Sequence, residues 1–105
     1  MNTLPPVTHL QFLILDALGA GEAAGAEVRS TLGNHGVGRT LPAFYELMGR
    51  LEKAGLVMGH YAPKSVNGQK VRERRYALTA DGSDAYEATC SFYRSRTGVR
   101  AQEAS

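Results

Sequence analysis

The residues best suited to chemistry lie on one side of the stretch from Arg39 to Leu56. Glu46 and Arg50 are four residues apart, so on a helix their side chains project from the same face. A glutamate can accept a hydrogen bond from N4 of cytosine, and an arginine can donate two to N7 and O6 of guanine. Ala43 and Gly49 lie on the same side and are small enough to permit close approach to a base pair. The alternative is an ordinary surface ion pair between Glu46 and Arg50, which contributes about 0.2 to 0.5 kcal/mol.

A single helix with marked ends would position these side chains. Thr40 can accept a hydrogen bond as the N-cap residue, Pro42 suits the first turn, and Gly55 suits a left-handed stop. The sequence therefore predicts a helix over residues 40–54. Its apolar residues recur at three- and four-residue steps and should form one stripe that faces a core, made of Leu41, Phe44, Leu47, Met48 and Leu51.

Positive charge is concentrated in this helix and in the segment that follows it. The whole chain has a net charge of only +2, but residues 39–75 contain eight basic and three acidic residues, a net charge of +5. Such asymmetry is typical of a domain with one edge against a polyanion. For Tyr45, packing on the flank of the core is an equal alternative to a phosphate contact. The further candidates for DNA contact are Arg39, Thr40, Tyr45, Lys53, Lys64, Lys70, Arg72 and Arg74.

Length and composition indicate one globular domain. A chain of 105 residues with 43% hydrophobic and 21% charged residues is ordinary for a folded domain, which excludes wholesale disorder. No apolar run approaches the roughly 18 residues that span a bilayer. The first residues also lack the basic flank and cleavage site of a secretory signal peptide. We therefore expect a cytoplasmic protein without membrane contact.

The sequence contains no pattern that indicates catalysis or a metal site. It has one cysteine, Cys90, and three scattered histidines, His9, His35 and His60, without metal-ligand spacing. There is no glycine-rich phosphate loop after a strand, no nucleophile with its base, and no cluster of carboxylates. We therefore expect no enzyme activity, no metal and no cofactor. Cys90 is expected to be a small buried hydrophobe, with an oxidation sensor as the alternative.

The first part of the chain predicts an extended leader and two helices. Pro5 and Pro6 keep residues 1–7 extended, and Thr8 can cap a helix over residues 9–18. A second helix is predicted over residues 22–32, weakened by a glycine in its first half. A glycine-rich loop then leads into the helix over residues 40–54.

After Gly55 the pattern changes from helical to extended. Residues 56–61 and 71–78 are predicted strands of a hairpin with a long basic tip, at which Asn67 and Gly68 form a turn. Thr79 can cap a last helix over residues 79–96. The tail, residues 97–105, has no periodic signal and is expected to be frayed or disordered.

Three helices followed by a basic hairpin is the order of elements in a winged helix-turn-helix domain. The predicted fold class is thus mainly α with a small β hairpin (α+β), with the DNA-binding domain over residues 8–78 and a C-terminal dimerisation helix. At residues 10–93 the chain also resembles the PadR-like winged-helix transcriptional regulators, in their compact form with one C-terminal helix. The resemblance is carried by Phe44, Tyr45, Leu47, Arg50, Leu51, Gly55, Leu56, Arg74, Tyr76, Leu78, Thr79 and Gly82. The segment AAGAEV and Ala43 depart from the PadR pattern, so regulators of the MarR type stay an alternative.

A winged helix can place one helix in the major groove and its hairpin on the adjoining backbone. We therefore expect a sequence-specific regulator of double-stranded DNA, with the helix over residues 40–54 reading bases and the wing contacting phosphates. The resemblance implies repression, and it implies a small-molecule effector in a cavity between the first and last helices. The alternative is a winged-helix module that binds proteins and has no specific DNA site.

A homodimer on an inverted repeat is expected because a monomer of this size covers little DNA. The last helix has aromatic side chains at helical spacing that a lone monomer would bury poorly. The first helix has an apolar excess that offers a second contact. The alternative is that the last helix folds back on its own domain. The predicted interface comprises Leu10, Phe12, Leu15, Ala85, Tyr86, Thr89, Phe92, Tyr93 and Arg96.

Overall fold

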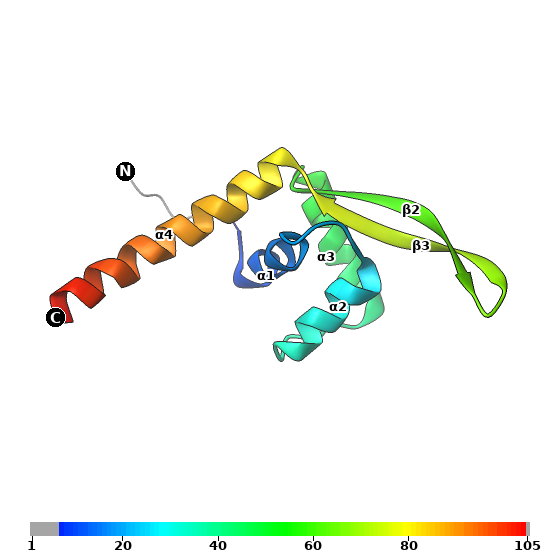
Figure 1. Ribbon diagram of the computed structural model, residues 1–105, viewed down its shortest axis with the longest axis horizontal. Coiled ribbons are helices and arrows are strands. Elements are labelled where there is room, and N and C mark those ends of the chain that lie inside the picture. Colours follow the sequence, from blue (N-terminus) through cyan, green and yellow to red (C-terminus); the bar gives the residue numbers. More distant parts are fainter. Residues whose placement is uncertain (1–6, 105) are drawn as a thin grey trace.

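In the computed structural model, which describes residues 7–104, the chain forms four helices and a three-stranded antiparallel sheet (Figure 1). Residues 1–6 of the predicted leader lie outside the described residues. This α+β winged helix is the predicted fold class. The elements are α1 (His9–Leu18), β1 (Ala23–Ala24), α2 (Gly25–Asn34), α3 (Leu41–Lys53), β2 (Val57–Val66), β3 (Gln69–Leu78) and α4 (Ala80–Ala104).

The predicted caps of α1 and α3 form. The hydroxyl of Thr8 accepts a hydrogen bond from the backbone N–H of Gln11 at 3.1 Å, and the Gln11 side chain accepts one in return from Thr8 N at 3.0 Å. In α3, Thr40 accepts from Ala43 N at 3.4 Å. Gly55 has a φ of 79°, the left-handed stop that glycine adopts without strain.

The core lies where α1, α2 and α3 meet the helix side of the sheet. The predicted stripe of α3 contributes to it, except that Leu41 is 48% exposed. Leu41 is in the first turn of α3 and faces an open hollow between α2 and α3, so its assignment to the core is wrong. The buried cluster comprises Ile14, Leu15, Leu18, Val28, Leu32, Phe44, Met48, Leu51, Val57 and Tyr76.

A two-residue strand, β1, occupies the start of the segment that we predicted as helix 22–32. Ala23 is paired with Tyr76 of β3 in antiparallel register, and α2 begins only at Gly25. Alanine favours helix locally, so this strand depends on the distant sheet edge rather than on its own sequence. A Cβ on Gly25 would lie 3.2 Å from the Tyr76 ring, and this close approach favours glycine there.

The wing is longer and its tip tighter than predicted. β2 and β3 pair along ten residues each, from Val57 opposite Leu78 to Val66 opposite Gln69. The connection is only Asn67 and Gly68, with φ of 53° and 80°, as expected of a tight type I′ hairpin turn. The predicted loop over residues 62–70 is therefore wrong. Neither face of the distal wing is buried, so no alternation marked these residues as strand.

The last helix begins at the predicted cap but extends further. Thr79 accepts a hydrogen bond from Gly82 N at 2.9 Å and donates one to the carbonyl of Gly55 at 2.6 Å. α4 then continues to Ala104, so the predicted end at 96 and the predicted disorder of residues 97–104 are wrong. No proline follows Pro63, and nothing in the sequence forces the helix to stop.

The wing and α4 project from the core in opposite directions (Figure 1). The molecule measures 60 × 26 × 22 Å, and its radius of gyration is 16.2 Å, against about 13 Å for a compact domain of this length. No helix within the described residues is both long enough and apolar enough to cross a bilayer.

Gly82→Ala should destabilise the protein by about 1 to 3 kcal/mol, because a Cβ there would collide with the backbone carbonyl of Leu56. That carbonyl cannot move freely, since it accepts a hydrogen bond from Thr79 N at 3.2 Å. Urea denaturation measures the change. Gly49→Ala is the control, because a Cβ there meets open space on a helix and should be neutral or slightly stabilising. Equal effects of the two substitutions would contradict the packing argument.

Candidate nucleic-acid interface

The outer face of α3 presents the predicted base-reading residues to solvent. Glu46, Gly49 and Arg50 are exposed, whereas Ala43 is half-buried. Glu46 and Arg50 form an ion pair at 2.7 Å, with both side chains about two-thirds exposed (66% and 69%). Such a pair is weak and reversible, so base contacts can replace it. Both interpretations of Glu46 and Arg50 are therefore compatible in one molecule, as a surface pair in the free protein and as base contacts in a complex.

The corner between α2 and α3 holds Arg39. Its guanidinium donates to the carbonyls of Val37 and Gly38 at 3.3 and 3.1 Å, while Arg29 Nε donates to the Arg39 carbonyl at 3.0 Å. Arg29 was missed because it lies alone among the acidic residues of the first 38, with no sequence signal that links it to Arg39. The exposed Tyr45 also lines the hollow of about 320 Å³ at this corner, with Ala26, Arg29, Ser30, Gly33, Gly38, Arg39 and Leu41.

The wing has two faces of different charge. Successive side chains of a strand point to opposite faces, so the register assigns each residue of β2 and β3 to one of them. The face that continues from buried Tyr76 is here named the helix-side face, because Tyr76 packs into the helical core. It carries Gly59, Tyr61, Lys70, Arg72 and Arg74, and the outer face carries His60, Lys64, Glu73 and Arg75.

Positive charge on the helix-side face stays available for a partner. Lys70 and Arg72 are exposed, and within the described residues neither forms an ion pair. The Arg72 guanidinium lies 4.5 Å from the centroid of the Tyr61 ring, a cation–π distance. Tyr61 is 55% exposed and was not among the predicted site residues. Its side chain carries no charge to mark it, and only the strand register places it beside Arg72.

Arg74 is engaged within the domain. Its Nη2 lies 2.8 Å from Oε1 of Glu52 in α3, and only 22% of its side chain is exposed. The adjacent Tyr76 side chain and the hydrogen bond to Glu52 raise the pKa of Arg74. Arg74 is therefore paired within the domain, and its contact with a phosphate stays a prediction.

Positive charge on the outer face is balanced by carboxylates. Glu73 lies 2.7 Å from both Lys64 and Arg75, and Glu22 lies 3.0 Å from Arg75 and 3.2 Å from His60. Hydrogen bonds from Lys64 and Arg75 hold the pKa of Glu73 below its usual value, so it stays ionised at neutral pH. Lys64, predicted as a phosphate contact, is therefore on the neutralised face.

Solved structures with this arrangement are transcription regulators. A PadR family transcription regulator from Clostridium difficile R20291 superposes with a TM-score of 0.71 and 22% identity, over 93% of this chain and 100% of that one. The chain has the PadR winged-helix fold. Bacillus subtilis PadR in complex with operator DNA superposes with a TM-score of 0.63 and 20% identity, over 76% of this chain and 45% of that one. NadR in complex with 4-hydroxyphenylacetate superposes with a TM-score of 0.67 and 25% identity, over 94% of this chain and 64% of that one. No family model matches the chain, and a search of curated proteins finds no match.

In this PadR fold, the first turns of α4 fold back on α1. The Phe12 and Tyr86 rings stack at 5.2 Å with an interplanar angle of 11°, and the Tyr86 hydroxyl donates to Asp16 Oδ1 at 2.6 Å. The hydrogen bond to Asp16 raises the pKa of Tyr86. Phe12 and Tyr86, predicted for a dimer interface, are thus half-buried by each other within one chain.

Other predicted interface residues also contribute to the monomer. Leu15 is fully buried in the core and has no surface to offer a partner, so its assignment is wrong. Thr89 is 4% exposed and donates to the Ala85 carbonyl at 2.7 Å. Leu10 and Ala85 pack partly buried against the core.

The later part of α4 keeps its aromatic side chains accessible. Tyr93 is 46% exposed, and its ring lies edge-on to that of Phe92 at 5.2 Å. Arg96 places its guanidinium 3.8 Å from the Phe92 ring centroid. Cys90 is a half-buried free thiol.

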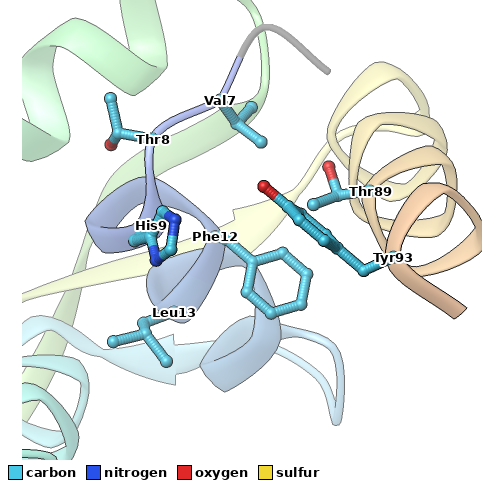
Figure 2. A pocket seen from close by; sticks show the side chains of 7 residues that line it. All are labelled: Val7, Thr8, His9, Phe12, Leu13, Thr89 and Tyr93. Carbon is cyan, nitrogen blue, oxygen red and sulfur yellow. The ribbon is translucent and has the colours of Figure 1, made fainter. Parts of the chain in front are cut away.

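A largely apolar cavity of about 290 Å³ lies between α1 and α4, where the resemblance to the PadR-like regulators implies an effector site (Figure 2). Figure 2 shows Phe12 and Leu13 on the α1 side and Thr89 and Tyr93 on the α4 side. Val7, Thr8 and His9 complete the lining. Within the described residues, no group of three or more His, Cys, Asp or Glu side chains is placed to hold a metal ion.

The two wing faces should differ in DNA binding. Replacing Lys70 and Arg72 together with alanine should lower the log–log salt slope of duplex binding by about 1.8, because each lost phosphate contact removes about 0.9. Lys64→Ala should leave the slope unchanged, since Lys64 is on the neutralised face. Fluorescence anisotropy at several salt concentrations measures both. A slope that falls equally for Lys64→Ala would contradict the assignment of faces.

Proposed function

We propose that this protein is a DNA-binding transcription regulator that acts as a repressor, with α3 in the major groove and the helix-side face of the wing on the adjoining backbone. The observation that carries the proposal is the split of charge on the wing. Among the described residues, Lys70 and Arg72 are exposed without carboxylate partners on the face shared with the helical core, while Lys64 and Arg75 are neutralised on the outer face. Exposed cations confined to one face favour a polyanion on that face.

The outer face of α3 supports base reading. Gly49 is exposed with open space around it, so a base pair can approach the backbone, and Arg50 can donate to guanine once its weak pair with Glu46 opens. Phosphate contacts by the wing, Arg39 and Lys53 would fix the register, while α3 would supply sequence information. Bacillus subtilis PadR, which has this fold, is solved in complex with operator DNA, and this supports DNA binding as the function.

A protein-interaction module is less favoured than DNA binding. The α3 and wing surface is basic, with exposed Arg39, Arg50, Lys53, Lys70 and Arg72. This positive surface matches nucleic acid better than an average protein partner.

A homodimer on an inverted repeat would double the DNA contacts. α4 projects from the core (Figure 1), and its exposed Tyr93 and half-buried Phe92 offer apolar area for a second copy. A two-fold dimer would place its α3 helices on half-sites about one helical turn, roughly 34 Å, apart. The interface we propose is thus the later part of α4, with Phe92, Tyr93 and Arg96 at its centre.

A small apolar effector in the α1–α4 cavity would relieve repression. The cavity joins the DNA-binding part to the helix proposed for dimerisation, so an occupant can change how two copies are held on DNA. NadR, which has the same fold, is solved with 4-hydroxyphenylacetate, and the aromatic ring of that ligand supports a small molecule with an apolar ring as the occupant.

The function is tested by selection of bound fragments from random duplex DNA, followed by titration of the selected duplex at two salt concentrations. We expect enrichment of an inverted repeat whose binding weakens steeply with salt. Failure to enrich any sequence, with only weak salt-sensitive binding, would contradict a sequence-specific regulator.

Phe92→Glu should convert the protein to monomers, because it buries a charge at the proposed interface. Sedimentation velocity measures the change in mass. Arg94→Glu is the matched control, since it places the same side chain about 200° further around α4 and should leave the dimer intact. A Phe92→Glu protein that sediments as a dimer would remove this part of α4 from the interface.

A further inference from the structure

An ion pair joins the wing to α3 at the point where the hairpin leaves the core. Arg74 of β3 and Glu52 in the last turn of α3 are 2.8 Å apart, and their side chains are only 22% and 31% exposed. The other ion pairs of the wing connect it to itself or to Glu22. Arg74–Glu52 therefore links the proposed phosphate-binding element directly to the proposed base-reading element.

Aromatic rings hold the guanidinium in place. Its Cζ lies 4.8 Å from the Tyr61 ring centroid and 5.4 Å from that of Tyr76. Tyr76 is 2% exposed and belongs to the core, so its ring gives the Arg74 guanidinium a firmly packed contact. An arginine confined by two rings loses less freedom when it binds a carboxylate than one free in solvent.

Gly59 of β2 provides the space for the pair. A Cβ at this position would lie 2.5 Å from both Arg74 Nη2 and Glu52 Oε1. The φ of Gly59 is not positive, so the backbone conformation does not require glycine. Because the atoms that a Cβ would meet are the ends of flexible side chains, Gly59→Ala should displace the ion pair rather than unfold the strand.

We propose that the Arg74–Glu52 pair, seated on Gly59, fixes the angle between the wing and α3 and thereby sets the spacing between phosphate and base contacts. The significance of this spacing for DNA rests on the proposed function, whereas the fixed angle is a property of the free protein. Glu52, Gly59 and Arg74 are positioning residues, since none of them is placed to contact a base.

The length of the wing explains why an ion pair to α3 is needed to hold it in place. β2 and β3 extend ten residues each, and an isolated two-stranded hairpin is marginally stable in water. Arg75 pairs with Glu22 on the outer face at 3.0 Å, so the neighbouring residues Arg74 and Arg75 hold the wing base from its two sides. Loss of the inner pair would leave the wing free to swing away from α3.

Pulsed electron spin resonance on the free protein tests the angle. Spin labels at Gly49→Cys on α3 and Lys70→Cys on the wing, in a Cys90→Ser background, should give a narrow distance distribution. Glu52→Gln and Gly59→Ala should each broaden or shift it. Glu46→Gln is the matched control for the distance measurement, because it removes an equal charge from α3 without a contact to the wing, and it should leave the distance distribution unchanged. Urea denaturation confirms that each variant is folded.

DNA binding by the same variants without spin labels is a second test. For Glu52→Gln, a simple change of net charge and the loss of the fixed angle predict opposite changes in DNA affinity. Removing a carboxylate near DNA should strengthen binding if only charge matters. The proposal instead expects Glu52→Gln and Gly59→Ala to weaken binding to the selected duplex on the order of tenfold. Both should also lower the salt slope by up to about 1.8, because the phosphate contacts of Lys70 and Arg72 are lost.

Reversing the charges of the pair is a third test. The double variant, Glu52→Arg with Arg74→Glu, should recover part of the narrow distance distribution, and each single reversal should not.

The outcomes separate the two proposals. An unchanged distance distribution in folded Glu52→Gln and Gly59→Ala proteins would overturn the fixed angle whether or not DNA binds. Tighter DNA binding by Glu52→Gln would overturn the role of the pair in contact spacing. If the distance distribution broadens in the variants but the unsubstituted protein selects no duplex, the fixed angle would be supported and the proposed function overturned.

Discussion

Burial of Tyr76 is the contact on which the arrangement of this protein depends. Tyr76 is in the central strand of the sheet, opposite Ala23 of β1 on one side and Gly59 of β2 on the other. Its ring packs beside Gly25 at the start of α2, where a Cβ would also approach the Phe44 ring. One side chain thus fixes the start of α2, the inner face of α3 and the base of the wing. Burying a ring of this size contributes several kcal/mol, more than any surface ion pair in the molecule.

From that base, strand alternation decides what the wing can do. Five cations lie on two strands, and local composition suggests one basic hairpin. The pleat instead sends Lys70, Arg72 and Arg74 to the face of Tyr76 and sends Lys64 and Arg75 to the opposite face, where Glu22 and Glu73 neutralise them. Among the described residues, the wing cations without an ion pair, Lys70 and Arg72, therefore lie on one face only, and it is the face nearest to α3.

The long helix α4 has two roles along its length. Its first turns close the monomer, because Tyr86 stacks on Phe12 and Gly82 fits against the carbonyl of Leu56. Beyond Thr89 it leaves the core with Tyr93 exposed, and a cavity lies beside α1 at the point of departure. The two interpretations that the sequence left open, a helix folded back and a helix for a partner, thus apply to successive parts of one element, the first as structure and the second as a proposal.

The sequence by itself determined the elements whose signals are local. Thr8, Thr40 and Thr79 as caps, Gly55 as a stop and Asn67-Gly68 as a turn each act through the few residues around them. The sequence also indicated the winged-helix order, since helical and extended periods alternate along the chain. Only the tertiary structure decided which surface each residue serves. β1 exists because Tyr76 is beside it, Leu15 is buried because the helices and the sheet pack into one core around it, and Arg74 pairs with α3 because Gly59 leaves room for Glu52. Those contacts join residues far apart in the chain, and no local pattern of charge or hydropathy encodes them.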